Sequence, residues 1–404
     1  MSDTPQLRRL VFVNRYYWPE EPATAQLLTD LAEGLAVAGR PVTVITSRPR
    51  GPGAPPARET RRGVGILRVG ATRAGRGLFA KALDYLTFSL AARRALAAQL
   101  GPGDRVIAMT DPPLLATIVA ARARGAGASV IHWLQDVHPE IGISLSGSRL
   151  LAAACAPWIR RRDAAWRQAQ ACVAVSNDMA AFVVTRGVPS DRVRAIHNWA
   201  LGGDRLDPVE PGKDPLVESW QLRGRIVVAY SGNLGRVHAL EPVIAAAAAL
   251  RGDPSLVFLF VGDGPQRPAL EAAARAAGLA SVRFLPPQPR DRLAASLSAA
   301  DIHLVTLRPG CERLVFPSKL YGIAAVGRPV VYVGPVDCEI AAIVRESGLG
   351  VTVPPDATDT LAAAIRDLAA DAPRRRRMGE AALAWSRRAG GLPAALAAWR
   401  ELLA

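Results

Sequence analysis

Twelve short apolar runs, separated by Ala- and Leu-rich stretches, constrain the fold of this chain more than any other feature. Apolar runs of this kind are typical of strands buried on both faces of a parallel sheet, with helices between them. The first series is Leu10–Asn14, Val42–Thr46, Val106–Met109, Val130–Leu134, Cys172–Ser176 and Val193–His197. The second series is Ile226–Tyr230, Val257–Val261, Val282–Leu285, Ile302–Leu307, Val330–Val333 and Val351–Val353.

The two series predict an α/β chain with two doubly wound, Rossmann-like parallel-sheet domains. A stretch rich in Gly, Pro and acidic residues, Gly202–Leu216, separates them. We therefore expect one domain over residues 1–205 and another over residues 217–384. Ligands of such sheets bind outside the carboxyl ends of the strands, so the cleft between the domains is the expected site.

Two glycine-rich turns in the second half are candidates for anion binding. The motif YSGNLGR follows the strand Ile226–Tyr230, and VGDGP closes the next strand. Glycines let backbone N–H groups approach an anion closely, and Arg236 adds a forked, permanently charged donor. Ordinary tight turns between strand and helix explain the same glycines. The residues concerned are Gly232, Asn233, Gly235, Gly262 and Gly264.

A third candidate is the motif FPSK, which leads into a predicted helix over Leu320–Val326. Ser318 and Lys319 then lie at a helix N-terminus, where unpaired N–H groups and the helix dipole favour an anion. The chain holds only three lysines, so an Arg-rich sequence that keeps Lys319 here suggests phosphate contact.

Polar residues also follow two strands of the first half. The motif NRYYWPEE, with Tyr17 and Glu20, follows the first strand, and QDVHPE, with Asp136 and His138, follows a later one. Both motifs should face the cleft, where Asp136 and His138 can meet an acceptor hydroxyl. A loop histidine with satisfied hydrogen bonds is the alternative for His138.

Several other chemistries lack their motifs. The sequence has no P-loop, no Gly-x-Gly-x-x-Gly, no nucleophile elbow and no Asp-x-Asp pair for a metal on a diphosphate. The four cysteines show no zinc-site spacing and are typical of thiols in a reducing compartment. We expect no metal and no cofactor, with Arg236 and Lys319 neutralising a leaving diphosphate.

The charge is concentrated in the first half. Of the formal net charge of +15, residues 51–100 contribute nine basic and two acidic side chains. They also carry apolar residues at helical spacing: Leu78, Phe79, Leu83, Leu86 and Leu90. This pattern predicts contact with an anionic membrane; the alternative is that the leucines are core residues and the arginines a solvated face. We expect no nucleic-acid partner, because aromatic residues are only 5% of the chain.

The motifs WPEEPATAQLL, QDVHPE, YSGNLGR, FVGDGP, VRFLPPQP, PSKLYGIAAVGRPVV and CEIAAIVRESGLGV occur in this order. Together they resemble family four of the retaining glycosyltransferases, which have the GT-B fold. The closest likeness is to bacterial transferases for O-antigen, capsule and colanic-acid-type polysaccharides, including the fucosamine transferase-like group. The likeness covers nearly the whole chain and is denser in the second half.

The resemblance implies that the second domain binds the nucleotide-sugar and the first binds the acceptor. It puts Gly232, Asn233, Arg236, Ser318 and Lys319 beside the donor diphosphate. It also implies that a C-terminal helix, about residues 385–404, packs back on the first domain.

The resemblance is incomplete at the donor ribose and base. Leu314 and Gly322 occupy the positions at which many members carry glutamates, so Glu339 and Glu312 are the remaining candidates for holding the ribose. The strand end at Phe284 would lie near the nucleobase.

We therefore predict a cytoplasmic, peripherally membrane-bound enzyme. It would transfer a sugar, expected to be a UDP-linked N-acetylated amino sugar, to a lipid-linked saccharide. Arg236, Lys319 and Asp136 are the candidate catalytic residues, and Tyr17, Glu20 and His138 the candidate acceptor-side residues. A sugar-nucleotide epimerase on the same fold and a non-catalytic binding subunit are the alternatives.

Overall fold

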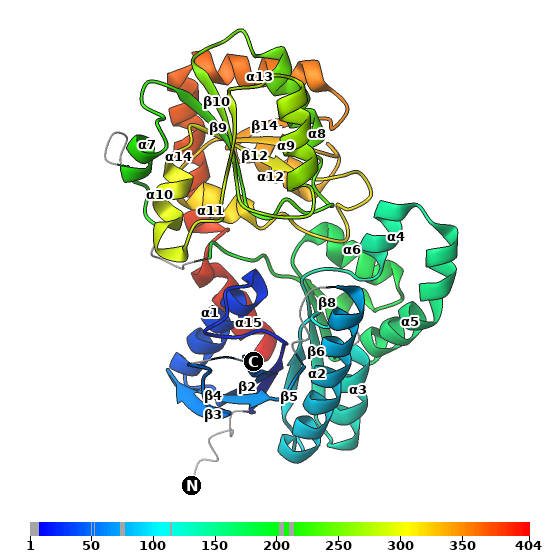
Figure 1. The fold of residues 1–404 in the computed structure, drawn as a ribbon. Helices are drawn as coiled ribbons and strands as arrows, with labels where there is room; N and C mark the ends of the chain where they lie inside the picture. Colours follow the sequence, from blue (N-terminus) through cyan, green and yellow to red (C-terminus); the bar gives the residue numbers. More distant parts are fainter. Residues whose placement is uncertain are drawn as a thin grey trace. The chain divides into compact units, whose positions relative to one another are not determined.

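The computed structural model describes residues 8–49, 51, 53–72, 77–113, 115–201, 206–209 and 214–404. The chain divides into two compact units, which are described separately (Figure 1). Unit 1 comprises the chain up to His197 together with Arg313–Val315 and Leu396–Ala404. Unit 2 comprises Asn198–Glu312 and Phe316–Ala395.

Unit 1 is built on a sheet whose described strands follow the order β3-β4-β2-β1-β5-β6-β7-β8. All neighbouring strands are parallel except β3, which is antiparallel to β4. The strands are β1 (Leu10–Val13), β2 (Val42–Ser47), β3 (Arg58–Arg61), β4 (Val64–Val69), β5 (Arg105–Ala108), β6 (Ser129–Leu134), β7 (Ala171–Ala174) and β8 (Val193–Ala195).

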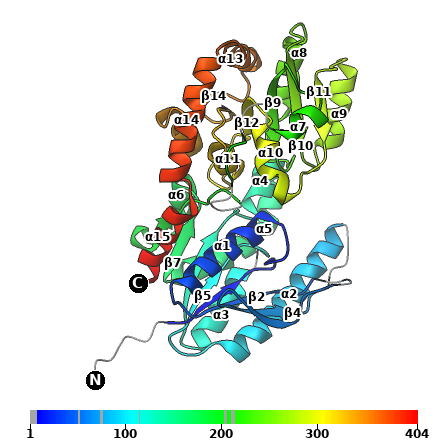
Figure 2. The ribbon, with the colours of Figure 1, turned by 90° about the vertical axis from the view of Figure 1, so that its left-hand side faces the viewer.

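Helices cover both faces of this sheet, which explains why its central strands are apolar throughout. They are α1 (Ala23–Val37), α2 (Leu78–Gln99), α3 (Leu115–Gly125), α4 (Glu140–Ser146), α5 (Arg149–Gln168), α6 (Asn177–Thr185) and the end of α15 (Leu392–Leu403). Figures 1 and 2 show α1 and α15 on one face and α2 and α3 on the other. Val11 and Val13 of β1 share a buried cluster with Phe88 and Leu96 of α2.

The hairpin of β3 and β4 is absent from the sequence-based prediction. Strand β4 buries Val64 and Ile66 in strict alternation, whereas β3 is polar and exposed at the sheet edge. Such an edge strand lacks the continuous apolar run that marks the central strands, so its basic residues indicated only a charged stretch.

The last helix, α15, packs within unit 1 through its C-terminal half. Trp399 is fully buried, and its ring centroid lies 5.3 Å from that of Trp133 in an edge-on arrangement. Arg40 donates a hydrogen bond of 2.9 Å to the Leu403 carbonyl, to which Arg105 also donates. Aromatic and carbonyl contacts therefore hold the end of the chain.

Unit 2 is built on an all-parallel sheet whose described strands follow the order β11-β10-β9-β12-β13-β14. The strands are β9 (Ile226–Ser231), β10 (Leu256–Val261), β11 (Val282–Leu285), β12 (Ile302–Thr306), β13 (Val330–Val333) and β14 (Gly350–Val353). The helices are α7 (Pro215–Ser219), α8 (Glu241–Ala249), α9 (Arg267–Ala276), α10 (Leu293–Ser298), α11 (Lys319–Ala325), α12 (Glu339–Glu346), α13 (Thr358–Ala370) and α14 (Ala372–Arg388).

Alternate residues of the unit 2 strands face two separate cores. Val228 and Phe258 pack towards α8, α9 and α13, whereas Val227 and Leu259 pack towards α7 and α10. Helix α11 is held against α14 by the stacking of Tyr321 on Trp385, with ring centroids 5.8 Å apart. This packing fixes the start of α11, where Lys319 lies.

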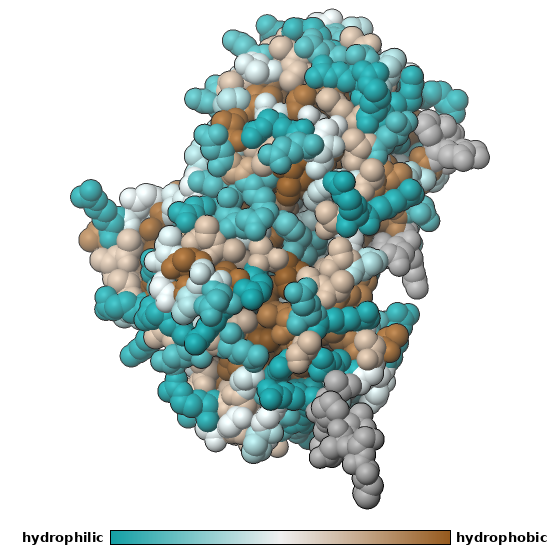
Figure 3. Space-filling model, turned by 180° about the vertical axis from the view of Figure 1, so that it is seen from behind, coloured by the Kyte–Doolittle hydropathy of each residue, from teal (hydrophilic) through white to brown (hydrophobic). Residues whose placement is uncertain are grey.

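The predicted fold class of two Rossmann-like parallel sheets is confirmed, and each of the twelve expected strands is present. Part of the expected linker, residues 202–205 and 210–213, lies outside the described residues. In the described part of the chain, no helix has the length and apolarity needed to cross a bilayer. The face seen in Figure 3 is largely hydrophilic, with hydrophobic side chains in separate patches.

We expect Trp399→Ala to destabilise unit 1 by about 3–5 kcal/mol, because it removes a large, fully buried aromatic side chain. Trp158→Ala is the matched control, since Trp158 is 47% exposed and should change stability by less than about 0.5 kcal/mol. Urea denaturation followed by circular dichroism measures both. Equal midpoints for the two variants would contradict the packing of α15 described above.

Candidate functional site

The candidate site in unit 2 lies at the carboxyl ends of its parallel strands. The loops that follow the strands meet at this edge, because parallel strands all end on the same side of a sheet. Four of them are residues 232–240 after β9, 262–266 after β10, 307–318 after β12 and 334–338 after β13. Most of the residues predicted to bind the donor belong to these loops.

The two glycine-rich loops are bound to each other by their backbones. Gly232, Gly262 and Gly264 have φ of +131°, +145° and +155°, a region that side chains rarely adopt. A Cβ on Gly262 would overlap the Gly232 carbonyl oxygen, and one on Gly264 would lie 2.7 Å from the Leu234 backbone. Gly262 and Gly264 therefore have a clear structural role in the turn, and their contact with a donor stays a prediction.

Lys319, the first residue of α11, reaches across to the end of β9. Its Nζ donates to the Tyr230 hydroxyl at 2.9 Å and lies 3.2 Å from His238 Nε2. The Tyr230 hydroxyl in turn donates to the Asn233 carbonyl at 2.8 Å. No described carboxylate lies within ion-pair distance of Lys319. The amine is therefore held by uncharged groups alone.

The tautomer of His238 follows from its other ring nitrogen. Nδ1 lies 2.6 Å from the Thr306 carbonyl oxygen, which can only accept, so Nδ1 carries the hydrogen. Nε2 is consequently an acceptor for Lys319. Burial, followed by the charge of Lys319, lowers the pKa of His238 to about 3. His238 is thus uncharged at neutral pH.

Burial also acts on Lys319 and Tyr230. It lowers the pKa of Lys319 to about 7, because no described anion compensates the desolvated ammonium. It raises the pKa of the Tyr230 hydroxyl well above its usual range. Among these three groups, Lys319 alone changes its charge near neutral pH.

Arg236 does not lie at a helix start. It is exposed in a turn, and α8 begins five residues later at Glu241. Arg308, which sequence reasoning missed, donates to the Arg236 carbonyl at 2.9 Å and forms a 2.6 Å ion pair with Glu241. Its backbone N–H also donates a hydrogen bond to the Val237 carbonyl, which holds the loop that carries His238.

The remaining predicted donor residues border the same edge of unit 2. Asn233 is exposed, and Gly235 accepts a 2.6 Å hydrogen bond from Gln266 through its carbonyl. Phe284, on β11, stacks on Phe260 with centroids 4.9 Å apart. Ser318 immediately precedes α11, a helix of only seven residues, so the anion argument rests on the Lys319 side chain.

Neither position of the missing glutamates suits a ribose contact. Leu314 is buried, and a Cβ on Gly322 would lie 3.2 Å from Leu297 Cδ1, inside the packing of α11. Glu339 begins α12 after β13, close enough to Tyr321 for its charge to add to the burial that raises the pKa of that hydroxyl. Glu339 therefore stays a candidate, as does Glu312, which is partly buried in the loop before α11.

Unit 1 presents a second polar cluster, at the carboxyl ends of β1, β5 and β6. Arg15 pairs with Asp111 at 3.2 Å, and Asp136 forms an isolated β-bridge with Val315. Burial raises the pKa of Asp136, the nearby Asp111 raises it further, and His138 opposes both. Asp136 and His138 thus lie together as expected, whereas Arg15 and Asp111 were missed. The motif TDPP directly after β5 was the available signal for Asp111.

The other two predicted acceptor-side residues, Tyr17 and Glu20, differ in how deeply they are buried. Tyr17 is 1% exposed and belongs to the core of unit 1, which does not favour its expected contact with an acceptor; that contact stays a prediction. Glu20 is partly buried, and its backbone N–H donates to the Tyr17 carbonyl at 3.0 Å. Position after a strand did not decide which side chain of NRYYWPEE turns inwards.

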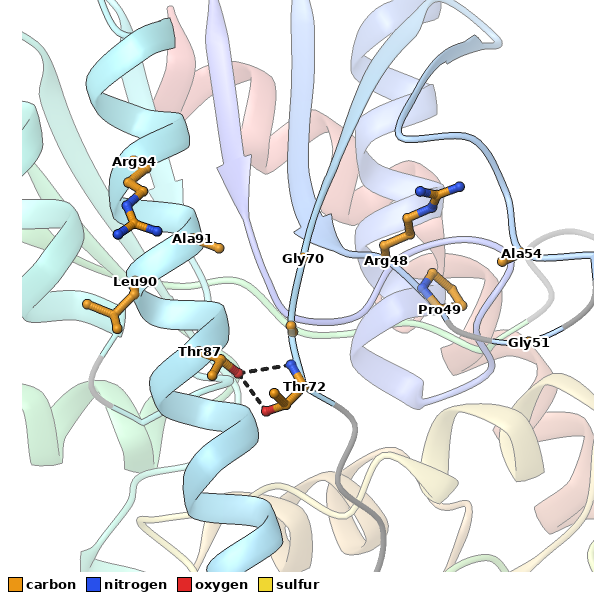
Figure 4. Close-up of a pocket in the computed structure, with 11 residues that line it drawn as sticks. Arg48, Pro49, Gly51, Ala54, Gly70, Thr72, Thr87, Leu90, Ala91 and Arg94 are labelled. Carbon is orange, nitrogen blue, oxygen red and sulfur yellow. Dashed lines mark hydrogen bonds between the residues drawn. The ribbon is translucent and has the colours of Figure 1, made fainter.

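Unit 1 also holds a cavity of about 620 Å³ beside α2. Figure 4 shows Thr87 on α2 pointing towards Thr72 in the chain that leaves β4. Leu90 and Arg94 of the same helix also line the cavity, and Arg48 follows β2. Thr87 Oγ1 is hydrogen-bonded to the Thr72 backbone N–H at 3.0 Å. The cavity combines two arginines with apolar walls.

Beside this cavity, α2 exposes an apolar stripe. Phe79 is 94% exposed, Leu83 and Leu90 are each 45% exposed, and Leu86 is 57% exposed. The alternative that these residues are core is therefore wrong for all four. The side chain of Leu78, and both Arg73 and Arg76, lie outside the described residues.

Comparison with known proteins gives two family matches. Residues 225–371 match the family described as "Glycosyl transferases group 1", and residues 24–199 match the "Glycosyl transferase 4-like domain". The putative colanic acid biosynthesis glycosyl transferase WcaI of Escherichia coli (strain K12) is 29% identical over 267 residues. The alignment spans 65% of this chain and 65% of that relative, slightly less than two thirds of its length.

Solved structures agree at the level of the fold. Sucrose-phosphate synthase from Thermosynechococcus elongatus has a TM-score of 0.78 at 20% identity, covering 98% of both chains. Anabaena HepE in complex with UDP has a TM-score of 0.73 at 15% identity, covering 98% of this chain and 99% of HepE. The chain has the GT-B fold, and each of its two halves is similar to a family of glycosyltransferases. The predicted fold is confirmed, while membership of family four, the retaining stereochemistry and the fucosamine transferase-like subgroup stay predictions.

We expect Gly262→Ala to lower the free energy of unfolding of unit 2 by more than about 2 kcal/mol, because the new Cβ must displace the Gly232 backbone. Gly252→Ala is the control: Gly252 has open space around a Cβ and should tolerate alanine. Thermal unfolding of both variants makes the comparison. An equal melting temperature for both would mean that the two glycine loops are not locked together.

Proposed function

We propose that this chain is a retaining glycosyltransferase. It takes a sugar from a nucleotide-sugar donor, UDP-linked and carrying an N-acetylated amino sugar, and transfers it to a lipid-linked saccharide in cell-surface polysaccharide synthesis. The donor binds at the carboxyl edge of the unit 2 sheet and the acceptor on unit 1. The structural neighbour HepE in complex with UDP-glucose supports a UDP-linked donor.

The observation that carries the proposal is the environment of Lys319. The Lys319 side chain is held by the uncharged His238 and Tyr230, beside the backbone of Gly232, lacks a described counter-ion and is suited to an anion. A donor diphosphate supplies that anion. As the glycosidic bond breaks, Lys319 and Arg236 would stabilise the charge that grows on the departing phosphate. That phosphate oxygen would take the acceptor proton on the same face, which requires positioning of the reactants and no enzymic nucleophile.

Unit 1 supports a lipid-linked acceptor. The cavity beside α2 offers Arg48 and Arg94 to a phosphate, and Leu90 of the exposed stripe lines the same cavity. A sugar-nucleotide epimerase has no use for an apolar stripe next to a basic cavity, so this pairing favours a transferase. Asp136 and His138 are the proposed polar contacts for the acceptor saccharide.

Substituting Lys319 tests the donor site. We expect Lys319→Ala to reduce transfer from UDP-N-acetylglucosamine by about 10²–10³-fold, which corresponds to about 2.7–4 kcal/mol of lost transition-state stabilisation. Arg236→Ala should also reduce it. Arg251→Ala, an exposed residue after α8 at the opposite edge of the sheet, is the control and should retain full activity. Release of UDP is the measurement.

Near wild-type turnover in both Lys319→Ala and Arg236→Ala would contradict the assignment of these residues to the donor site. EDTA should leave the rate of transfer unchanged. Loss of transfer in the presence of EDTA would contradict a metal-independent reaction. Thermal stabilisation by a panel of nucleotide-sugars, measured first, identifies the donor, because a ligand of the native state raises the melting temperature. A panel without effect would contradict the proposed donor site, and stabilisation without any turnover would favour the non-catalytic alternative.

The exposed stripe on α2 gives a membrane test. We expect the protein to co-sediment with anionic but not with neutral vesicles, and binding to weaken as salt rises. Changing Phe79, Leu83 and Leu86 together to serine should abolish most of the binding, because they are the exposed apolar residues at the start of the stripe.

The matched control changes Leu150, Leu151 and Trp158 of α5, which are 85%, 39% and 47% exposed in the same unit. This variant should still bind anionic vesicles. An equal loss of binding in both triple variants would show that α2 is not the specific contact. Equal binding of the wild type to neutral and anionic vesicles would contradict an electrostatic contribution to membrane binding.

A further inference from the structure

The directions of the surrounding hydrogen bonds show which groups accept from Lys319 Nζ. Because Nδ1 of His238 donates to Thr306 and the Tyr230 hydroxyl donates to Asn233, both groups must accept from Lys319 Nζ. An uncharged amine has two N–H groups and one lone pair. In that form the two acceptors use both hydrogens, and the lone pair occupies the remaining position on Nζ. An ammonium would carry a third N–H there, for which the described residues offer no acceptor.

We propose that Lys319 is a proton-linked anion anchor, which is held as an amine by His238 and Tyr230 and takes up a proton from water when an anion binds beside it. In the protonated form, the third position on Nζ becomes an N–H donor and can contact the anion. The anion and the proton then bind together, and each tightens the binding of the other. This inference rests on the proposed donor site and adds its coupling to pH.

Among the neighbouring described groups, Lys319 is the one whose charge changes with pH near neutral pH. The end of β9 contributes Tyr230, whose pKa is raised by burial, and the following loop contributes His238, whose pKa of about 3 keeps it uncharged. After β12, Arg308 is paired with Glu241 at 2.6 Å. Burial among neutral partners, with no described counter-ion, lowers the pKa of Lys319 itself to about 7.

The sign of the pH dependence follows directly. An anion favours the ammonium and raises the pKa of Lys319 in the complex. Between the pKa of the unliganded protein and that of the complex, binding must take up a proton, so affinity falls as pH rises. One coupled proton corresponds to at most about a tenfold loss per pH unit. Below pH 7, where Lys319 is already charged, affinity should level off.

The sequence makes this measurable, because it contains only three lysines, Lys81, Lys213 and Lys319. Protein labelled with ¹³C at lysine Cε should give three NMR signals, and Lys319→Arg should remove one of them and assign it. We expect that signal to titrate near pH 7 without ligand. Sulfate and UDP-N-acetylglucosamine, neither of which titrates in this range, should each move its midpoint up by at least about one pH unit.

Affinity measured by calorimetry from pH 6.5 to 9 should fall with pH for the wild type, whereas Lys319→Arg, which keeps its charge, should show a flat profile. A Lys319 signal that titrates near pH 10 without ligand would overturn the anchor, and so would a midpoint that neither ligand moves. Failure of sulfate to bind at pH 6.5 would overturn it as well. Proton-linked sulfate binding without any nucleotide-sugar binding would leave the anchor standing and refute the proposed donor.

Discussion

Burial of both faces of a parallel sheet is the constraint on which both units depend. Strands such as β1 and β10 are apolar at every position because helices cover them on each side. Parallel strands must also run in one direction, so each unit gathers the loops that follow its parallel strands at a single edge. The polar chemistry of unit 2 is concentrated at such an edge, and one of the polar clusters of unit 1 lies at another.

At the edge in unit 2, backbone geometry creates the conditions for the side chains. Gly262 and Gly264 let the loop after β10 touch the loop after β9 closely, which fixes the path of residues 232–240. His238 and Tyr230 are then presented to Lys319 from one side. The result is a desolvated amine whose partners are all neutral, an arrangement that is costly for a cation and is relieved by a bound anion.

Helix α2 shows how the same sequence pattern can serve two faces. Phe88 and Leu96 are fully buried, whereas Phe79 and Leu86 on the same helix are largely exposed. Periodicity identifies apolar residues at helical spacing, but it does not say which face the sheet will cover. The exposed stripe could therefore be separated from the core only once α2 was packed against α3 and the sheet.

The sequence by itself determined the two sheets, the central strands and the glycine-rich turns, because these depend on local runs of residues and on backbone freedom. It also singled out Lys319 as one of three lysines. Tertiary structure alone decided its partners, since Lys319 is 89 residues from Tyr230 and 81 from His238 along the chain. They meet because β9 pairs with β12, whose following loop leads to α11. Burial and hydrogen-bond direction arise only from such non-local pairing, which is why the core position of Tyr17, the edge hairpin and the state of Lys319 could not be predicted from the sequence pattern.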